Sequence, residues 1–163
     1  MLRGLTTVTF YADDLTAARR WYTELLGIEP YFEREVEGRP AYIEFRIGDY
    51  QHELGFVDSR YAPSDRSDGV GGATIYWHVD DVKAGFERLL SLGASVHQQP
   101  IERGPGFVTA SVVDPFGNVL GIMYNQHYLD VLGRLRPCRP SPRASLAPGV
   151  RPGRHAPPYA FVR

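Results

Sequence analysis

The sequence predicts an α+β fold of two tandem βαβββ modules, because one pattern is written twice along the chain. Each copy places an Asp-Asp pair directly after an apolar run, at positions 13–14 and 80–81. Each pair is followed by a helical pattern that stops at a glycine, Gly27 in the first copy and Gly93 in the second. The offset is 67 residues at the aspartates and 66 at the glycines. We therefore expect two modules that form a curled mixed sheet around a shared cavity, with the helices on its outer face.

The two expected helices follow the Asp-Asp pairs. A carboxylate at a helix start accepts a free backbone N–H, so one aspartate of each pair is placed to cap its helix. Apolar residues then recur at helical spacing. They are Leu15, Ala18, Trp21, Tyr22 and Leu25 in the first copy, and Val82, Phe86, Leu89 and Leu90 in the second. Capping accounts for the aspartates, so a structural role is preferred to a metal-binding one.

The expected strands have two faces of different kinds, since side chains alternate along a strand. The apolar face suits contact with the helices; its members include Val8, Phe10, Ile43, Phe45, Ile47, Leu54, Phe56, Ile75, Trp77, Val79, Ala110, Val112, Leu120 and Ile122. The opposite face carries hydroxyls, rings, carboxylates, an arginine and a histidine. Such a face is either exposed to solvent, as in many antiparallel sheets, or forms the wall of a ligand cavity. We favour the cavity, because its large aromatic side chains are costly to leave in water.

The polar face supplies the candidate site. The candidate ligand-binding residues are Thr7, Thr9, Tyr11, Tyr42, Arg46, Glu53, Thr74, Tyr76, Phe107, Thr109 and Met123. Glu53 is also a candidate catalytic residue, because a lone carboxylate among hydroxyls and rings can act as a general base. The alternative is a residue held by hydrogen bonds to Thr7 or Thr74. His78 is the second catalytic candidate, as a proton shuttle near neutral pH, with a satisfied polar residue as its alternative. Arg46 is expected to form an internal ion pair with Glu44, with an anchor for an acidic ligand as the alternative.

Residues 1–133 are expected to form a single domain, and residues 134–163 a disordered Arg/Pro-rich tail. The tail holds seven arginines, seven prolines and no acidic residue, without helical or strand periodicity. The domain is expected to divide as module one at about 5–58, a linker at 59–72, module two at about 73–126 and a terminal helix at 127–133.

Charge and composition exclude several classes of function. The net charge of −1 leaves about −8 on residues 1–133, which is unsuited to nucleic-acid backbones. No apolar run approaches a membrane span and no signal pattern begins the chain, so a cytoplasmic protein without membrane partners is expected. The single cysteine, Cys138, makes disulfides and thiolate metal sites improbable.

Three motifs resemble the vicinal oxygen chelate superfamily, the glyoxalase, bleomycin-resistance and extradiol-dioxygenase group. The first is Asp14-Leu15 with Trp21-Tyr22 and Leu25-Leu26-Gly27, and the second is Val79-Asp80-Asp81-Val82. The third is Asp114-Pro115-Phe116-Gly117, similar to the family's turn before its last strand. The resemblance covers roughly residues 5–125. It implies the tandem βαβββ fold and a homodimer whose partner completes each cavity, but the fold alone does not define an activity.

The resemblance also implies where a metal would be bound. Metal-dependent members use ligands at positions that correspond here to Thr7, Glu53, Thr74 and Gly121. A divalent ion needs about three or four good donors, and this set holds one carboxylate, two neutral hydroxyls and a glycine. No metal residues and no cofactor are therefore predicted, although a divalent ion completed by other residues is retained as a disfavoured alternative.

Two hypotheses of function follow. The favoured one is a metal-free protein that binds a small molecule, such as an aromatic or cationic antibiotic, as bleomycin-resistance-type members do. The alternative is a glyoxalase, isomerase or dioxygenase-type enzyme that uses Glu53, with or without a metal completed elsewhere. Whether the protein is an enzyme is left open at this point.

Overall fold

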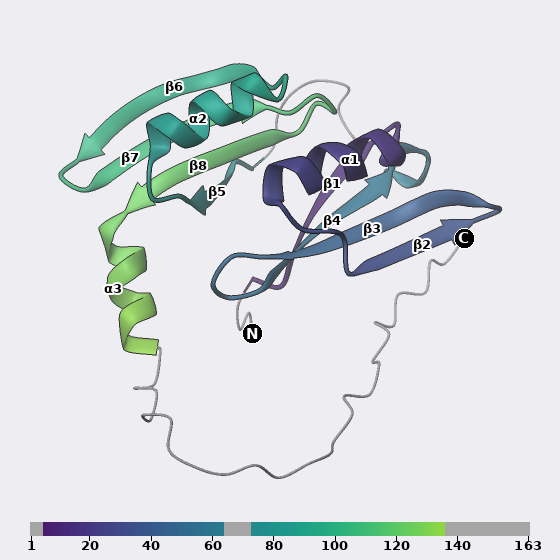
Figure 1. The fold of residues 1–163 in the computed structure, drawn as a ribbon, viewed down its shortest axis with the longest axis horizontal. Helices are drawn as coiled ribbons and strands as arrows, with labels where there is room; N and C mark the ends of the chain where they lie inside the picture. Colours follow the sequence, from purple (N-terminus) through teal and green to yellow (C-terminus); the bar gives the residue numbers. More distant parts are fainter. Residues whose placement is uncertain (1–4, 64–72, 136–163) are drawn as a thin grey trace, which may run out of the picture.

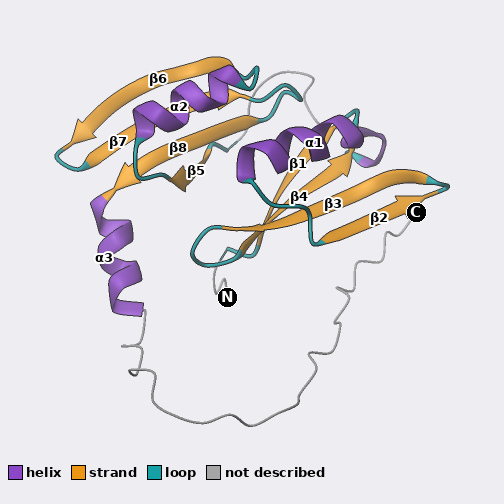
Figure 2. Ribbon diagram, in the orientation of Figure 1, coloured by secondary structure: helices purple, strands orange, loops and turns teal. Residues whose placement is uncertain are grey.

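The computed structural model describes residues 5–63 and 73–135 of the 163-residue chain. Each half contains a strand, a helix and three further strands (Figure 1; Figure 2). The elements of the first half are β1 (Thr7–Ala12), α1 (Leu15–Leu26), β2 (Phe32–Val36), β3 (Arg39–Ile47) and β4 (His52–Asp58), followed by a short 3-10 helix, η1 (Ser59–Tyr61). Those of the second half are β5 (Ile75–His78), α2 (Val82–Ser91), β6 (Ser95–Gly104), β7 (Phe107–Val113) and β8 (Val119–Asn125), followed by α3 (Gln126–Leu135).

The α+β class and the tandem βαβββ modules predicted from the repeat are confirmed. The eight strands are divided between two four-stranded sheets, one in each module, with the orders β1-β4-β3-β2 and β5-β8-β7-β6. The first strand of each module pairs in parallel with the last, and the other pairs are antiparallel. Equivalent strands thus hold equivalent places in the two sheets.

The second aspartate of each pair is the helix cap. A side-chain oxygen of Asp14 accepts the backbone N–H of Ala17, and one of Asp81 accepts that of Ala84, each at 2.9 Å. Gly27 and Gly93 end the two helical segments with φ of +69° and +94°, a backbone conformation that glycine adopts without strain.

Each helix packs on the apolar face of its own sheet, α1 on β3 and β4 and α2 on β6, β7 and β8. The side chains of Tyr22, Phe45 and Phe56 are fully buried in the resulting core. The polar face predicted for each sheet is therefore the one turned away from the helices. Trp77, predicted to be a core residue, packs against this core.

A hydrogen-bonded network joins the two modules. The Tyr22 hydroxyl of α1 donates to Asp114 in the β7–β8 turn at 2.7 Å. The side chain of Asn118 in the same turn donates to the backbone oxygen of Tyr11 in β1 and accepts its N–H. The Trp21 indole N–H donates to the Leu92 carbonyl at 2.7 Å, which connects α1 to the end of α2. The turn motif of the second module is thus a structural joint.

The described residues contain no helix that is long and apolar enough to cross a membrane. Of the expected tail at 134–163, residues 134 and 135 belong to α3. The residues from 136 onward and the linker residues 64–72 lie outside the part that the structure describes.

Candidate functional site

The strand register of module one gathers a cluster of polar and aromatic side chains on its outward face. Arg46, Glu53 and Thr7 lie in register on β3, β4 and β1, and Glu44, Gly55 and Thr9 form the next row. We call this cluster the module-one polar face; it consists of Thr7, Tyr31, Tyr42, Glu44, Arg46 and Glu53.

Glu53 is held by two hydroxyl groups. The Thr7 hydroxyl donates to Oε2 at 2.7 Å, and the Tyr31 hydroxyl donates to Oε1 at 3.2 Å. Glu53 itself is half-buried. It is therefore an oriented carboxylate that a ligand can still reach.

Glu44 lies beside it and is fully buried. Its Oε2 accepts a short hydrogen bond from the Tyr42 hydroxyl, whereas Oε1 is buried without a hydrogen-bond partner. The pKa of Glu44 is raised from its ordinary value of 4.5 to about 7, chiefly by burial and then by the negative charge of Glu53, while Arg46 opposes the rise. Glu44 can therefore gain or lose a proton near neutral pH.

The position of Tyr42 depends on a glycine in the neighbouring strand. A Cβ at Gly55 would lie 2.9 Å from atoms of the Tyr42 ring, so only glycine lets the ring cross β4. Gly55 thus leaves the space in which the Tyr42 ring lies when its hydroxyl contacts Glu44.

The predicted ion pair between Arg46 and Glu44 is wrong. Arg46 is exposed, and its guanidinium lies over the Tyr31 ring, 4.2 Å from the ring centroid. A cation over an aromatic face is stabilised by the ring quadrupole. Because Glu44 is buried beneath its neighbours, the charged end of Arg46 is directed to the surface instead.

Module two has a polar face of different character. The Arg103 guanidinium donates to Thr109 at 3.1 Å and to Gln98 at 3.1 Å. His97 Nδ1 and the Ser111 hydroxyl are hydrogen-bonded at 2.8 Å. This face therefore offers a cation and an imidazole where module one offers carboxylates.

The candidate ligand-binding residues differ widely in exposure. Thr9, Arg46 and Phe107 are exposed; Tyr42 and Thr109 are buried; and Thr7, Tyr11, Glu53, Thr74, Tyr76 and Met123 are half-buried. The hydrogen bonds described above join them only within each module.

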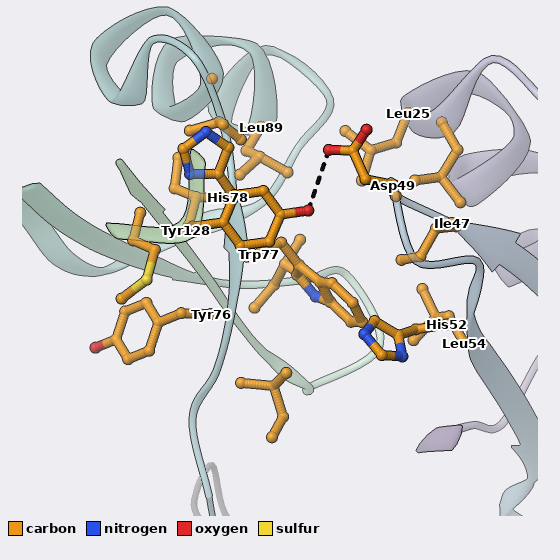
Figure 3. Close-up of a pocket in the computed structure, with 18 of the residues that line it drawn as sticks. Leu25, Ile47, Asp49, His52, Leu54, Tyr76, Trp77, His78, Leu89 and Tyr128 are labelled. Atoms are coloured by element: carbon orange, nitrogen blue, oxygen red, sulfur yellow. Dashed lines mark hydrogen bonds between the residues drawn. The ribbon is translucent and has the colours of Figure 1, made fainter. Parts of the chain in front are cut away.

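His78 belongs to a different environment. It lines a cavity of about 480 Å³ between the two modules, together with Tyr76 (Figure 3). Met123 also lines this cavity. The imidazole stacks on Tyr128 of α3 with ring centroids 4.5 Å apart. No hydrogen bond among the described residues links His78 to Glu53, so the structure does not combine the two catalytic candidates.

The residues at the implied metal positions do not fit a divalent ion. Glu53 already accepts hydrogen bonds from Thr7 and Tyr31. At Gly121 an added Cβ would lie 2.7 Å from the Tyr76 ring and 2.8 Å from the Ile75 carbonyl, so the space for a carboxylate there is filled. Neither half of the described chain contains a group of three His, Cys, Asp or Glu residues that could hold a metal.

Sequence reasoning missed three contributors to these faces. Tyr31 precedes β2 and contacts Glu53 from another strand, and His97 and Arg103 lie on β6, where register shifts interrupt the alternation. For Glu44 the signal was available, since strand parity placed it on the polar face. Its burial could not be anticipated, because it depends on rings brought in from neighbouring strands.

The fold agrees with the comparison to known families. Residues 4–122 match the Glyoxalase/Bleomycin resistance protein/Dioxygenase superfamily. The chain belongs to this superfamily, as the sequence motifs predicted. A search of curated proteins found no match.

Solved structures show the same fold at low sequence identity. A glyoxalase-related enzyme from Fulvimarina pelagi is 22% identical with a TM-score of 0.60, over 76% of this chain and 89% of that one. Lactoylglutathione lyase from Agrobacterium tumefaciens is 23% identical with a TM-score of 0.55, over 76% and 94%. TioX from Micromonospora sp. ML1 is 17% identical with a TM-score of 0.56, over 76% and 99%. The group thus includes a protein named as a lyase and one whose name states no activity.

Proposed function

We propose that the protein binds a small aromatic cation on the module-one polar face, without a resident metal. The observation that carries the proposal is the half-buried Glu53 carboxylate beside the ring of Tyr31, whose hydroxyl donates to it. Carboxylates supply charge to a cation, and aromatic faces supply stacking and cation–π attraction.

The expected selectivity can be tested with three planar molecules of one shape, benzamidinium, benzamide and benzoate. Benzamidinium should bind most tightly and benzoate least, because the Glu53 carboxylate is accessible on this face. Titration followed by NMR measures the three affinities. Glu53→Gln should remove most of the preference for the cation, whereas Glu87→Gln on the exposed side of α2 serves as the matched control. Tightest binding of benzoate would contradict the proposal.

The absence of a resident metal is tested separately, because cation binding and metal binding could both involve Glu53. Protein purified without chelator should show no stoichiometric zinc, nickel or iron(II) by metal analysis, and calorimetric titration with each ion should show no tight binding. The reason is the poor donor set around Glu53. Tight binding of any of the three ions would overturn this part and favour an enzyme of the metal-assisted type.

We further propose that a second copy of the chain completes the site. The carboxylates of module one complement Arg103 of module two, and three apolar side chains of β6 and β7 are exposed, Val96 by 46%, Ile101 by 38% and Phe107 by 36%. Self-association would remove these side chains from water. Sedimentation at micromolar concentration should show a dimer, and Ile101→Glu should shift it toward monomer. A monomeric parent chain would contradict the prediction.

One observation favours an enzymatic alternative. A buried carboxyl with a pKa of about 7 is suited to general acid–base catalysis, and Glu44 lies next to the more accessible Glu53. An enzyme would convert its bound ligand, whereas a binding protein would return it unchanged. Mass spectrometry of ligand recovered from the complex separates the two functions.

A further inference from the structure

The cavity between the modules is lined by both faces of β5 and β8, and it shares no residue with the module-one polar face. Its walls are Leu25 of α1, Ile47 and Leu54 at the ends of β3 and β4, and Trp77, Leu89 and Ile122 of module two. Figure 3 shows the Trp77 ring extending from β5 toward His52 of module one. At about 480 Å³ the cavity is within the range of small-molecule sites and has the mainly apolar walls typical of them.

The buried polar atoms without hydrogen-bond partners gather here. Four such side-chain atoms occur among residues 5–63 and 73–135, and three of them belong to two cavity-lining residues, Trp77 Nε1 and both ring nitrogens of His78. The Asp80 Oδ1 is 3.8 Å from His78 Nε2, beyond hydrogen-bonding distance. A buried N–H that has no partner costs free energy, so an occupant that accepts a hydrogen bond would be stabilised.

The charged side chains that line the cavity already have partners. Asp49 accepts a hydrogen bond from the Tyr128 hydroxyl at 3.1 Å, which closes one side of the space (Figure 3). Arg88 is paired with Glu24 at 3.5 Å. An occupant therefore meets mainly apolar walls, one indole donor and the imidazoles of His52 and His78, while the carboxylate of Asp49 and the guanidinium of Arg88 are already engaged.

We propose that this cavity is a second ligand site, which takes an uncharged aromatic molecule carrying a hydrogen-bond acceptor. The acceptor receives the Trp77 indole N–H, and the ring of the ligand packs against Leu25, Leu89 and Ile122. The site is independent of the module-one polar face, which binds cations.

Acetophenone and its isostere α-methylstyrene test the proposal, because they differ only in the carbonyl oxygen that would accept the N–H. Acetophenone should bind about threefold to tenfold more tightly, the effect of one hydrogen bond. Trp77→Phe should abolish this ratio while the protein stays folded, since it removes a donor that has no partner. Trp21→Phe, which loses an indole outside the cavity, is the matched control. Titrations followed by NMR measure all six affinities.

A second variant locates the site. Leu25→Phe narrows the cavity from α1 and should weaken both compounds equally, whereas Glu53→Gln on the polar face should leave both unchanged. Failure of the parent chain to bind either compound, or a ratio that Trp77→Phe leaves intact, would overturn the proposal. Loss of binding in Glu53→Gln would also overturn it, because the compounds would then occupy the polar face.

Discussion

Asp114→Ala is expected to destabilise the protein by about 3–5 kcal/mol, the largest effect of any single change considered. Asp114 is 3% exposed and accepts hydrogen bonds from the Tyr22 hydroxyl and from the backbone N–H groups of Phe116 and Asn118. Its removal leaves these donors without an acceptor in a buried turn. Denaturant unfolding at neutral pH, with the midpoint and slope compared between variants, gives the loss of free energy.

Comparing Asp114→Ala with Tyr22→Phe separates the stability lost within the β7–β8 turn from that lost with the hydrogen bond between the modules. The Tyr22 hydroxyl is kept protonated because burial and the negative charge of Asp114 raise its pKa well above the ordinary value. Tyr22→Phe should cost only about 1 kcal/mol, since it removes a donor together with its requirement for an acceptor. The double variant should therefore be more stable than the sum of the single changes implies. A loss below about 1 kcal/mol in Asp114→Ala would show that the network does not join the modules.

The repeat in the sequence was sufficient to predict the fold because it is made of local signals. The capping aspartates, the helical spacing of Leu15 to Leu25 and the glycine stops each act within a few residues, and they appear twice. The two faces of each strand could also be predicted from the sequence, since the alternation of side chains requires no knowledge of the neighbouring strands. These signals do not determine how one module lies against the other.

The parts of the site that sequence reasoning missed all depend on contacts between distant segments. Tyr42 can cross β4 only because position 55 is glycine, and the pairing of positions 42 to 46 with β4 is visible only in the structure. The Arg46 guanidinium lies over the ring of Tyr31, a residue from another segment of the chain. His78 ends a four-residue strand and stacks on Tyr128 of α3, 50 positions later. The spacing of residues along the chain does not predict such contacts.

Glu44→Gln is expected to change how stability depends on pH, which makes it the most specific test of the buried carboxyl. In the folded chain the pKa of Glu44 is about 7, whereas in the unfolded chain it is near the ordinary value of 4.5. Between these values the unfolded state binds fewer protons, so the free energy of unfolding falls as pH rises. The contribution of Glu44 is therefore fully present below about pH 4.5 and lost above about pH 7.

The Gln variant keeps an acceptor for the Tyr42 hydroxyl but has no proton to lose. It should match the parent chain near pH 4.5 and become more stable relative to it as pH rises, by at most about 3 kcal/mol above pH 7. Thermal or denaturant unfolding across this range measures the difference. Glu87→Gln, the same change on the exposed side of α2, should show no such growing difference. If Glu44→Gln and the parent chain ran parallel from pH 4.5 to 8, Glu44 would be ionised at neutral pH. The acid–base alternative would then lose its support, and Glu53 would be the remaining carboxylate with a chemical role.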